Sequence, residues 1–224
     1  MGWIALIPMR KGSKGIKNKN VHFLAGIPLF QHTINAATNA KAEAIYISTD
    51  IKEILESPKQ DGIFKIRRTK NLAGDEIPMA DVVLDFLSEG IGADIADSKT
   101  IVLLQVTSPL RNSEDIRKAL QLFEQVKGNL VISVTDAKND VLKYGLISGG
   151  KFQHISSPEY SFQNRQRLPK VYRPNGAIYI FKAGWFRSKK SFATPSTFAY
   201  KMPAERSVDI DTIDDFKLVE KKLF

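Results

Sequence analysis

A basic segment near the N-terminus carries the first residues that could do chemistry. Residues 10–20 read RKGSKGIKNKN, with five cationic side chains within ten positions. The two glycines allow tight turns that bring backbone N–H groups close to an anion. The segment follows the apolar run 3–9, which is typical of a buried strand, and ligands of open α/β sheets gather where strands end. We therefore predict a phosphate-binding loop rather than a solvated basic turn, with donors from Arg10, Ser13, Lys14, Lys19 and Asn20.

Two aspartates near the C-terminus form the second candidate site. Asp209 and Asp211 flank Ile210, and residues i and i+2 of an extended segment project to the same side. Two carboxylates on one side offer the hard oxygen ligands that Mg²⁺ and Mn²⁺ prefer. The alternative is negative charge at the start of a helix, the role we expect for Asp214 and Asp215. A phosphate loop in the same chain favours Mg²⁺, because nucleoside triphosphates arrive with that ion.

Two further segments place polar side chains where the chain is expected to leave a strand. Residues 103–111 read LLQVTSPLR, and an amide such as that of Gln105 at a buried strand end needs hydrogen-bond partners. Residues 164–180 read NRQRLPKVYRPNGAIYI, and their arginines can form forked contacts with carboxylates. Asn175 and Gly176 could turn the chain into the next strand. Both segments therefore hold candidates for contacts with an acidic ligand.

Apolar runs alternate with amphipathic stretches along the first 135 residues. Pro28 suits a first helical turn, and Ser113 with the two acidic residues after it suits the start of a later helix. This alternation predicts a parallel sheet with helices on both faces. The expected strands are 3–9, 44–49, 64–67, 100–105 and 130–135, and the expected helices are 28–40, 51–57, 79–88 and 112–126.

The regular alternation stops after Thr135. Residues 138–174 contain many polar or aromatic residues, the glycine pair Gly149-Gly150 and a Ser-Ser-Pro turn, which predicts an inserted arm or hairpin. Strands are expected again at 177–181 and 198–201. A final helix is expected over 213–223, capped by Thr212 and Asp215. We therefore predict one domain, residues 1–224, with the arm 138–174 inserted in it.

The composition limits the kind of protein. A chain of 224 residues that is 43% hydrophobic can bury one full core, and the lack of cysteine excludes disulfides and thiolate chemistry. The three histidines lack metal-ligand spacing. With no long apolar run and no signal-peptide layout, we expect no membrane partner and a cytoplasmic location. The net charge of +9 lacks the basic-aromatic pattern of single-strand binders, so we expect no nucleic-acid partner.

Four segments resemble the motifs of the acylneuraminate cytidylyltransferases, in the same order and along nearly the whole chain. This family comprises the CMP-sialic acid synthetases and bacterial relatives that act on legionaminic and pseudaminic acids. The resemblance implies an α/β, Rossmann-like three-layer αβα nucleotidyltransferase fold with a mostly parallel sheet and a dimerisation arm. It also implies a Mg²⁺-dependent reaction that joins CTP and a nine-carbon 2-keto sugar acid to give a CMP-sugar and pyrophosphate. The segments are residues 10–20, 103–111, 165–180 (RQRLPKVYRPNGAIYI) and 207–212 (SVDIDT).

On the nucleotide side, the resemblance assigns roles to the basic loop and to one later arginine. Arg10 and Lys14 would neutralise charge that grows on the departing pyrophosphate, and Arg68 would help to recognise cytosine. Asp209 and Asp211 would bind the metal, and Asp211 is also a candidate acceptor of the hydroxyl proton. The implied nucleotide contacts are Arg10, Ser13, Lys14, Lys19, Asn20 and Arg68.

On the sugar side, the resemblance points to two different parts of the chain. Tyr179 and Phe192 would form the pocket for the N-acyl group of the sugar. Lys143 and Arg165 belong to the arm, which in this family reaches into the partner subunit's active site and so implies a homodimer. The implied substrate contacts are Gln105, Lys143, Arg165, Asn175, Tyr179 and Phe192.

The chain departs from the family pattern at two places. Val106 stands where a proline is usual, which we expect to change loop rigidity rather than chemistry. Residues 76–79 (EIPM) replace a Thr/Ser-rich stretch that contacts nucleotide and sugar in the sialic acid enzymes. The sugar acid therefore stays open, and CMP-pseudaminate or CMP-Kdo synthesis is the alternative.

Two other classes of protein share single features with this chain. An NAD(P)-dependent oxidoreductase would share the α/β rhythm and could use Asp50 at the end of the second strand, but G-x-G-x-x-G is missing. The Gly-Lys-Ser/Thr ending of a P-loop is missing as well. A nucleic-acid-binding protein would explain the positive charge but not the paired aspartates. Both rank below the transferase.

Overall fold

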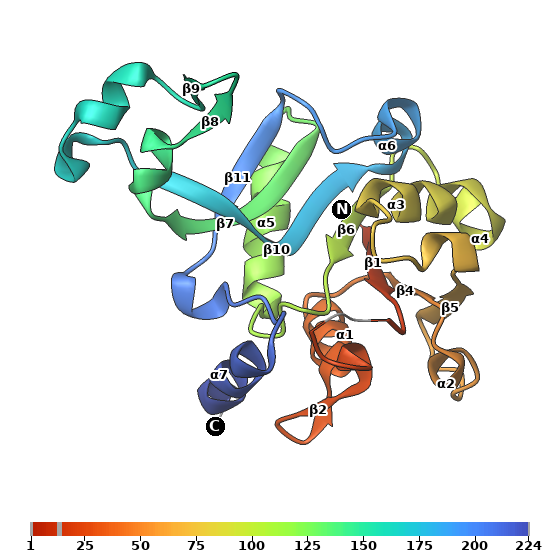
Figure 1. The fold of residues 1–224 in the computed structure, drawn as a ribbon. Coiled ribbons are helices and arrows are strands. Elements are labelled where there is room, and N and C mark those ends of the chain that lie inside the picture. The colour runs from red at the N-terminus through yellow and green to blue at the C-terminus, as the bar shows by residue number, and fades with distance from the viewer. Residues whose placement is uncertain (1, 13–14, 224) are drawn as a thin grey trace.

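The computed structural model describes residues 2–12 and 15–223, and seven of the strands in that part form a central sheet (Figure 1). They are β1 (Trp3–Met9), β4 (Ala44–Thr49), β5 (Ile63–Arg67), β6 (Thr100–Leu104), β7 (Leu130–Ala137), β10 (Val171–Lys182) and β11 (Thr197–Lys201). Their order across the sheet is β11-β7-β10-β6-β1-β4-β5. β10 is antiparallel to both of its neighbours, and the other pairs are parallel. The sheet is therefore mostly parallel, as predicted.

Helices cover both faces of the sheet. They are α1 (Leu29–Asn39), α2 (Lys52–Leu55), α3 (Met79–Ser88), α4 (Gly90–Ala93), α5 (Ser113–Gln125), α6 (Ala183–Lys189) and α7 (Ile213–Leu223). Side chains of α1, α5 and α7 share one hydrophobic cluster, and those of α3 and α6 share another. Alternation along β1 separates the two clusters, because Ala5 and Ile7 belong to the first whereas Ile4 and Leu6 belong to the second. The expected three-layer αβα arrangement is therefore present.

Helix caps agree with the sequence at one end of the chain and differ at two other places. Thr212 and Asp215 cap α7 as predicted, since the Thr212 N–H donates to Asp215 Oδ2 at 2.8 Å. The cap of α5, however, is Asn112 and not Ser113. Its side chain accepts from the Asp115 N–H at 3.0 Å, and the Asp115 carboxylate accepts from the Asn112 N–H at 3.1 Å. Pro28 precedes α1 instead of lying in its first turn, because it belongs to the short hairpin of β2 (Phe23–Leu24) and β3 (Ile27–Pro28).

Strand β10 is longer than the strand 177–181 that the sequence predicts. It begins at Val171 rather than at residue 177, so residues 171–174 of the expected insertion lie in the main sheet and pair with β7. Asn175 and Gly176 do not turn the chain. They form an irregularity inside the strand, where the pairing with β7 shifts between Pro174 and Tyr179. Gly176 has φ 76°, a left-handed conformation that favours glycine.

The inserted segment projects away from the main sheet (Figure 1). It holds a separate two-stranded sheet of β8 (Gly145–Ser148) and β9 (Lys151–His154), followed by two short 3₁₀ turns. Several of its large apolar side chains face solvent: Ile147 is 79% exposed and Phe162 is 88% exposed. The arm that leaves the main sheet therefore comprises residues 138–170. In the part of the chain that the structure describes, no helix is long and apolar enough to cross a membrane.

Candidate functional site

Four parallel strands place four polar residues at one edge of the sheet. Strands β1, β4, β5 and β6 lie side by side and point the same way, so their carboxyl ends meet. The residues that follow them are Arg10, Asp50, Arg68 and Gln105. A cavity of about 300 Å³ opens at this edge. Seven residues that the sequence nominated line the cavity, namely Arg10, Lys19, Asn20, Arg68, Gln105, Asp209 and Asp211.

The basic loop is fixed at both of its described ends. The side chain of Asn20 donates to the Arg10 carbonyl oxygen at 2.8 Å, and the Lys11 N–H donates to the Asp50 carboxylate at 2.7 Å. The guanidinium of Arg10 forms an ion pair with Asp75 across the mouth of the cavity. Asp75 is a functional neighbour that sequence reasoning did not select. Two further loop predictions, Ser13 and Lys14, fall outside the described residues.

The basic loop and the paired aspartates meet, although about 190 positions separate them. The ammonium of Lys19 is buried, contacts the Ile210 carbonyl oxygen and lies 3.2 Å from Asp211 Oδ1. A Cβ atom added to Gly15 would lie 1.9 Å from the Asp211 carbonyl oxygen, so this position cannot hold a side chain without movement of the backbone. The structure therefore joins a cationic loop to an anionic segment at one wall of the cavity.

The two aspartates differ in their surroundings. Burial raises the pKa of Asp209, a hydrogen bond from Thr107 opposes that shift, and the charge of Asp211 adds to it. Asp209 Oδ1 is buried and has no hydrogen-bond partner among the described residues. The side chain of Asp211, by contrast, is 74% exposed. A buried carboxylate oxygen without a partner is costly unless something positively charged reaches it.

This donor set fits a magnesium ion that also binds phosphate. Within the described residues, no group of three or more His, Cys, Asp or Glu side chains could hold a metal by itself. Mg²⁺ in nucleotide enzymes takes only one or two carboxylates and completes its shell with phosphate oxygens and water. The unpaired oxygen of Asp209 and the neighbouring carboxylate of Asp211 match that requirement.

Arg68 is a buried cation in the cavity wall. Its Nη2 donates to the Ser48 carbonyl oxygen at 3.1 Å. Burial lowers its pKa to about 10; the charge of Asp50 opposes the shift and that of Arg10 adds to it. The side chain is therefore still cationic at neutral pH, and it can donate to acceptor atoms of a ligand.

The end of β6 is held by a second buried arginine. Arg111 Nη1 donates to the carbonyl oxygens of Gln105 and Ala177, each at 3.1 Å, and so ties β6 to β10. Burial lowers the pKa of Arg111 to about 10, against the opposing charge of Asp115. The sequence marked the polar turn that contains Arg111, but not its burial. Gly176 approaches the same place, since a Cβ there would lie 3.2 Å from Gln105 Oε1.

Three of the predicted substrate contacts, Asn175, Tyr179 and Phe192, lie in or against β10, and none of them lines the cavity. Asn175 is buried and does not line it: its Oδ1 accepts from Ser133 at 2.5 Å and its Nδ2 donates to Ser207 at 2.9 Å. The rings of Tyr179 and Phe192 pack with centroids 5.5 Å apart. Burial raises the pKa of Tyr179, and the charge of Asp209 adds to that shift. Both rings pack against the hydrophobic cluster that includes α3 and α6, away from the cavity lining.

The two predicted arm residues do not reach the cavity of their own chain. Lys143 Nζ donates to the Gln163 carbonyl oxygen at 2.5 Å, within the arm. Arg165 lines a different hollow, which also includes Asp136 and Lys170. Within one chain, Lys143 and Arg165 therefore lie apart from the seven predicted residues that line the cavity.

A family model described as cytidylyltransferase matches residues 4–217. The chain is 37% identical over 232 aligned residues to an N-acylneuraminate cytidylyltransferase of Streptococcus agalactiae, covering 99% of this chain and 53% of that protein. It is 34% identical to the CMP-N,N'-diacetyllegionaminic acid synthase of Legionella pneumophila, covering 97% of this chain and 94% of that protein. The chain thus spans about half the length of the streptococcal relative.

A solved structure extends the similarity to the fold. The chain is similar to a CMP:2-keto-3-deoxy-manno-octonic acid synthetase complexed with CTP, with a TM-score of 0.72. The match covers 100% of this chain and 98% of the other at 16% sequence identity. At that identity the likeness concerns the fold, which is the α/β nucleotidyltransferase fold expected from the sequence.

Proposed function

Because this chain belongs to the cytidylyltransferase family, we propose that it joins CTP and a nine-carbon 2-keto sugar acid of the N-acylneuraminate or legionaminate type to give a CMP-sugar and pyrophosphate. Two relatives that match nearly the whole of this chain support this substrate class, since they are named for N-acylneuraminate and for diacetyllegionaminic acid. CMP-pseudaminate or CMP-Kdo synthesis stays the alternative.

The observation that carries the proposal is the meeting of opposite charges at the strand edge. Arg10, Lys19 and Arg68 supply three cations around the cavity, and Asp209 and Asp211 supply two carboxylates against them. Cations alone would suit any phosphate compound. The added carboxylate pair suits a triphosphate that carries Mg²⁺, and it distinguishes the site from a simple anion pocket.

The reaction is the attack of the sugar's anomeric hydroxyl oxygen on the α-phosphorus of CTP. A new phosphorus–oxygen bond forms, the bond to pyrophosphate breaks, and the hydroxyl proton leaves. No covalent enzyme intermediate is required, which agrees with a chain that lacks cysteine. Arg10, Lys14, Lys19 and the donor groups of Ser13 and Asn20 would hold the phosphates, so that positive charge stands where pyrophosphate gains negative charge.

Asp209 and Asp211 would hold the magnesium ion, whose contribution when bound is to neutralise phosphate oxygens and acidify the attacking hydroxyl. Asp211 is also our candidate for the proton acceptor, because its carboxylate is exposed toward the cavity and pairs with Lys19. An Asp211→Asn protein that kept full turnover at saturating Mg²⁺ would remove that role.

The remaining site residues would divide between base and sugar. Arg68, a buried donor at the wall, would contact the acceptor edge of cytosine. Gln105 would contact the sugar acid from the end of β6, and the Tyr179–Phe192 pair would receive the N-acyl group.

The arm completes the proposal. We treat residues 1–224 as one catalytic domain and its inserted segment, residues 138–170, as a dimerisation arm that carries Lys143 and Arg165 into the partner subunit's site. Their separation from the cavity of their own chain supports this arrangement. So do the exposed apolar side chains of the arm, which large interfaces would cover. The cytoplasmic location stays a prediction.

Pyrophosphate release tests the function directly. Purified protein with Mg²⁺ and CTP is offered N-acetylneuraminic, legionaminic, pseudaminic and Kdo acids in turn, and ATP, GTP and UTP replace CTP as controls. Release with N-acetylneuraminic or legionaminic acid is the expected result, and only when CTP is the nucleotide. Release with Kdo or pseudaminic acid would establish the alternative substrate. Absence of release from folded protein that binds CTP would reject the sugar acids and keep only the nucleotide site.

A further inference from the structure

The segment that carries Asp209 and Asp211, residues 207–211, belongs to no strand or helix. β11 ends at Lys201, a single 3₁₀ turn covers Ala204–Arg206, and residues 207–211 have no regular secondary structure. The Ile210 N–H donates to the Thr107 carbonyl oxygen at 2.8 Å, which fixes the backbone to the end of β6. Other contacts must therefore hold the carboxylates at the cavity.

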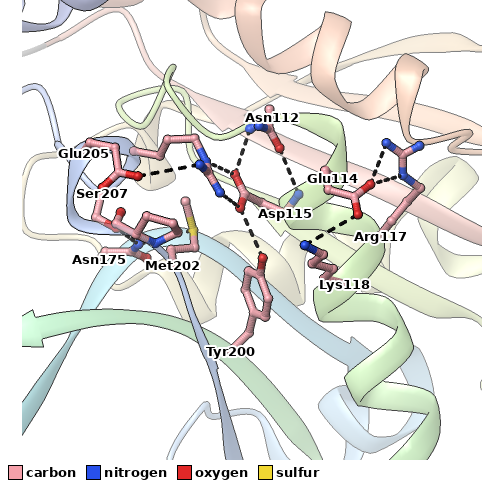
Figure 2. Close-up of polar contacts among 12 residues, drawn as sticks. Asn112, Glu114, Asp115, Arg117, Lys118, Asn175, Tyr200, Met202, Glu205 and Ser207 are labelled. Carbon is pink, nitrogen blue, oxygen red and sulfur yellow. Dashed lines mark hydrogen bonds and ion pairs between the residues drawn. The ribbon is translucent and has the colours of Figure 1, made fainter.

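The first of these contacts is a forked ion pair. Arg206 Nε and Nη2 donate to the two oxygens of Asp115 at 2.9 and 2.8 Å. Figure 2 shows Asp115 at the centre of this network, with the Tyr200 hydroxyl donating to it at 3.1 Å and the backbone of Asn112 contacting it from the helix end. Burial alone would raise the pKa of Asp115, but the bonds from Arg206 and Asn112 and the charge of Arg206 outweigh it and hold that pKa below its usual value.

The second contact is a buried amide. Asn175 Nδ2 donates to the Ser207 hydroxyl at 2.9 Å, and Ser207 in turn donates to the Pro203 carbonyl oxygen at 2.8 Å. Asn175 is itself fixed by Ser133 of β7. Figure 2 shows Asn175, Met202 and Ser207 grouped beside the Asp115 network. The segment is thus attached to α5 on one side and to the middle of the sheet on the other.

We propose that Arg206, through Asp115, and Asn175, through Ser207, are positioning residues that hold the Asp209 and Asp211 carboxylates together for a divalent cation. None of the four lines the cavity, and Ser207 lies two residues before Asp209. The inference rests on the proposed function only in taking the two aspartates as metal ligands. Loss of an outer contact of this kind commonly weakens metal affinity 10- to 100-fold.

The test compares Arg206→Met with Arg117→Met as a matched control. Arg117 also pairs with a carboxylate of α5, Glu114, but that pair is exposed and lies within the helix (Figure 2). Mn²⁺ binding to the CTP complex is measured by electron paramagnetic resonance and corrected for Mn²⁺ bound to free CTP. We expect roughly 10- to 100-fold weaker binding for Arg206→Met, an intermediate value for Arg206→Lys and no change for Arg117→Met. CTP affinity without metal should stay within about twofold.

Hydrogen exchange gives a readout that needs neither metal nor activity. The Ile210 amide should exchange faster in Arg206→Met, while the amides of β1 keep their protection. Unchanged Mn²⁺ affinity together with unchanged Ile210 exchange would overturn the proposal. If Arg206→Met does not fold, Arg206→Lys and Ser207→Ala carry the same comparison. The proposed function and the positioning role can fail separately. If the wild-type protein transfers CMP to none of the acids, the proposed function is rejected. If Arg206→Met nevertheless binds Mn²⁺ more weakly than wild type, the positioning role is kept.

Discussion

The cavity at the strand edge and the arm are built in opposite ways. Cavity residues come from four strand ends, a loop and the segment 207–211, and contacts with other parts of the same chain fix most of them. The arm holds a two-stranded sheet of its own, and several of its large apolar side chains are exposed. The cavity residues are therefore fixed by contacts within one chain, whereas the arm has apolar surface to be covered.

The cavity and the arm differ in what holds them in place. The sheet fixes the cavity, because Arg10, Arg68 and Gln105 directly follow strands that are paired in register within the core. The exposed apolar side chains of the arm belong to neither hydrophobic cluster. The arm is held instead by local turns and by the pairing of β8 with β9. Substitutions in the cavity should lower catalytic activity without changing the oligomeric state. Substitutions on the arm should change the oligomeric state, and activity should fall as a consequence.

The largest effect is expected at Asp209. Asp209→Asn keeps the shape of the side chain but removes the charge of its unpaired buried oxygen. We expect turnover to fall by roughly 10²-fold or more, the usual cost of losing a group that stabilises transition-state charge. Pyrophosphate release at saturating CTP measures it. Asp214→Asn, an exposed change at the start of α7, is the control, and equal activity of the two variants would count against the metal site.

The next effect is expected where loop and aspartate segment touch. Gly15→Ala would push a methyl group against the Asp211 carbonyl oxygen, 1.9 Å from the added carbon, and so separate the two motifs. We expect a loss of activity of about 10- to 100-fold, since misplacement of reacting groups by about 1 Å costs on the order of 10²-fold. Gly12→Ala is the matched control, because its nearest neighbour is the flexible end of Arg10 at 3.7 Å. Comparable losses in both variants would show that the contact with Asp211 is not the cause.

A third prediction concerns the arm. Ile147→Asp places a charge on the most exposed part of the hairpin, where an apolar interface would have to exclude it. We expect a shift from dimer to monomer in light scattering, with an activity loss of about tenfold and an unchanged melting temperature of the core. Ile91→Asp changes an equally apolar, exposed residue outside the arm and should leave the dimer intact. A dimer that tolerates Ile147→Asp would remove this face from the interface.

Mixing two inactive variants sharpens the same point. If Arg165 serves the partner subunit, then Arg165→Ala and Asp211→Asn subunits should form mixed dimers with one intact site. We expect activity to recover to a fraction of the wild-type value after subunit exchange. Exchange verified by mass spectrometry with no recovery would argue that each site is built from one chain.

The smallest effect concerns stability and its sign. The pKa of Asp209 is raised in the folded protein, so the folded state binds the proton more tightly than the unfolded state does. At neutral pH the ionised group is therefore a cost to folding, and that cost disappears as the pH falls through the raised pKa. Asp209→Asn should therefore melt at a slightly higher temperature than wild type at pH 7 without metal or CTP. The gain should vanish at low pH in scanning calorimetry, and a lower melting temperature at pH 7 would contradict it.

The sequence determined the elements and the chemical types at the site. Periodicity located β1, β4, α3 and α7 with correct bounds, because each pairs an unambiguous apolar pattern with a clear stop. The basic loop, the polar end of β6 and the paired aspartates nominated six residues that line the cavity, and the family resemblance added Arg68. The carboxyl ends of parallel strands meet at one edge, which explains why residues that follow different strands share this cavity. The sequence did not locate the bulge at Gly176, since an Asn-Gly pair signals a turn as readily as an irregular strand.

Only the tertiary structure decided which side chains meet across long stretches of chain. Lys19 with Asp211, Arg10 with Asp75 and Arg206 with Asp115 each join positions at least 65 residues apart, and no local pattern encodes such pairs. The burial of Arg111 and the unpaired oxygen of Asp209 are likewise properties of the packed molecule. A sequence fixes which groups are available and on which face of an element they lie, whereas their desolvation and partners depend on how the layers pack.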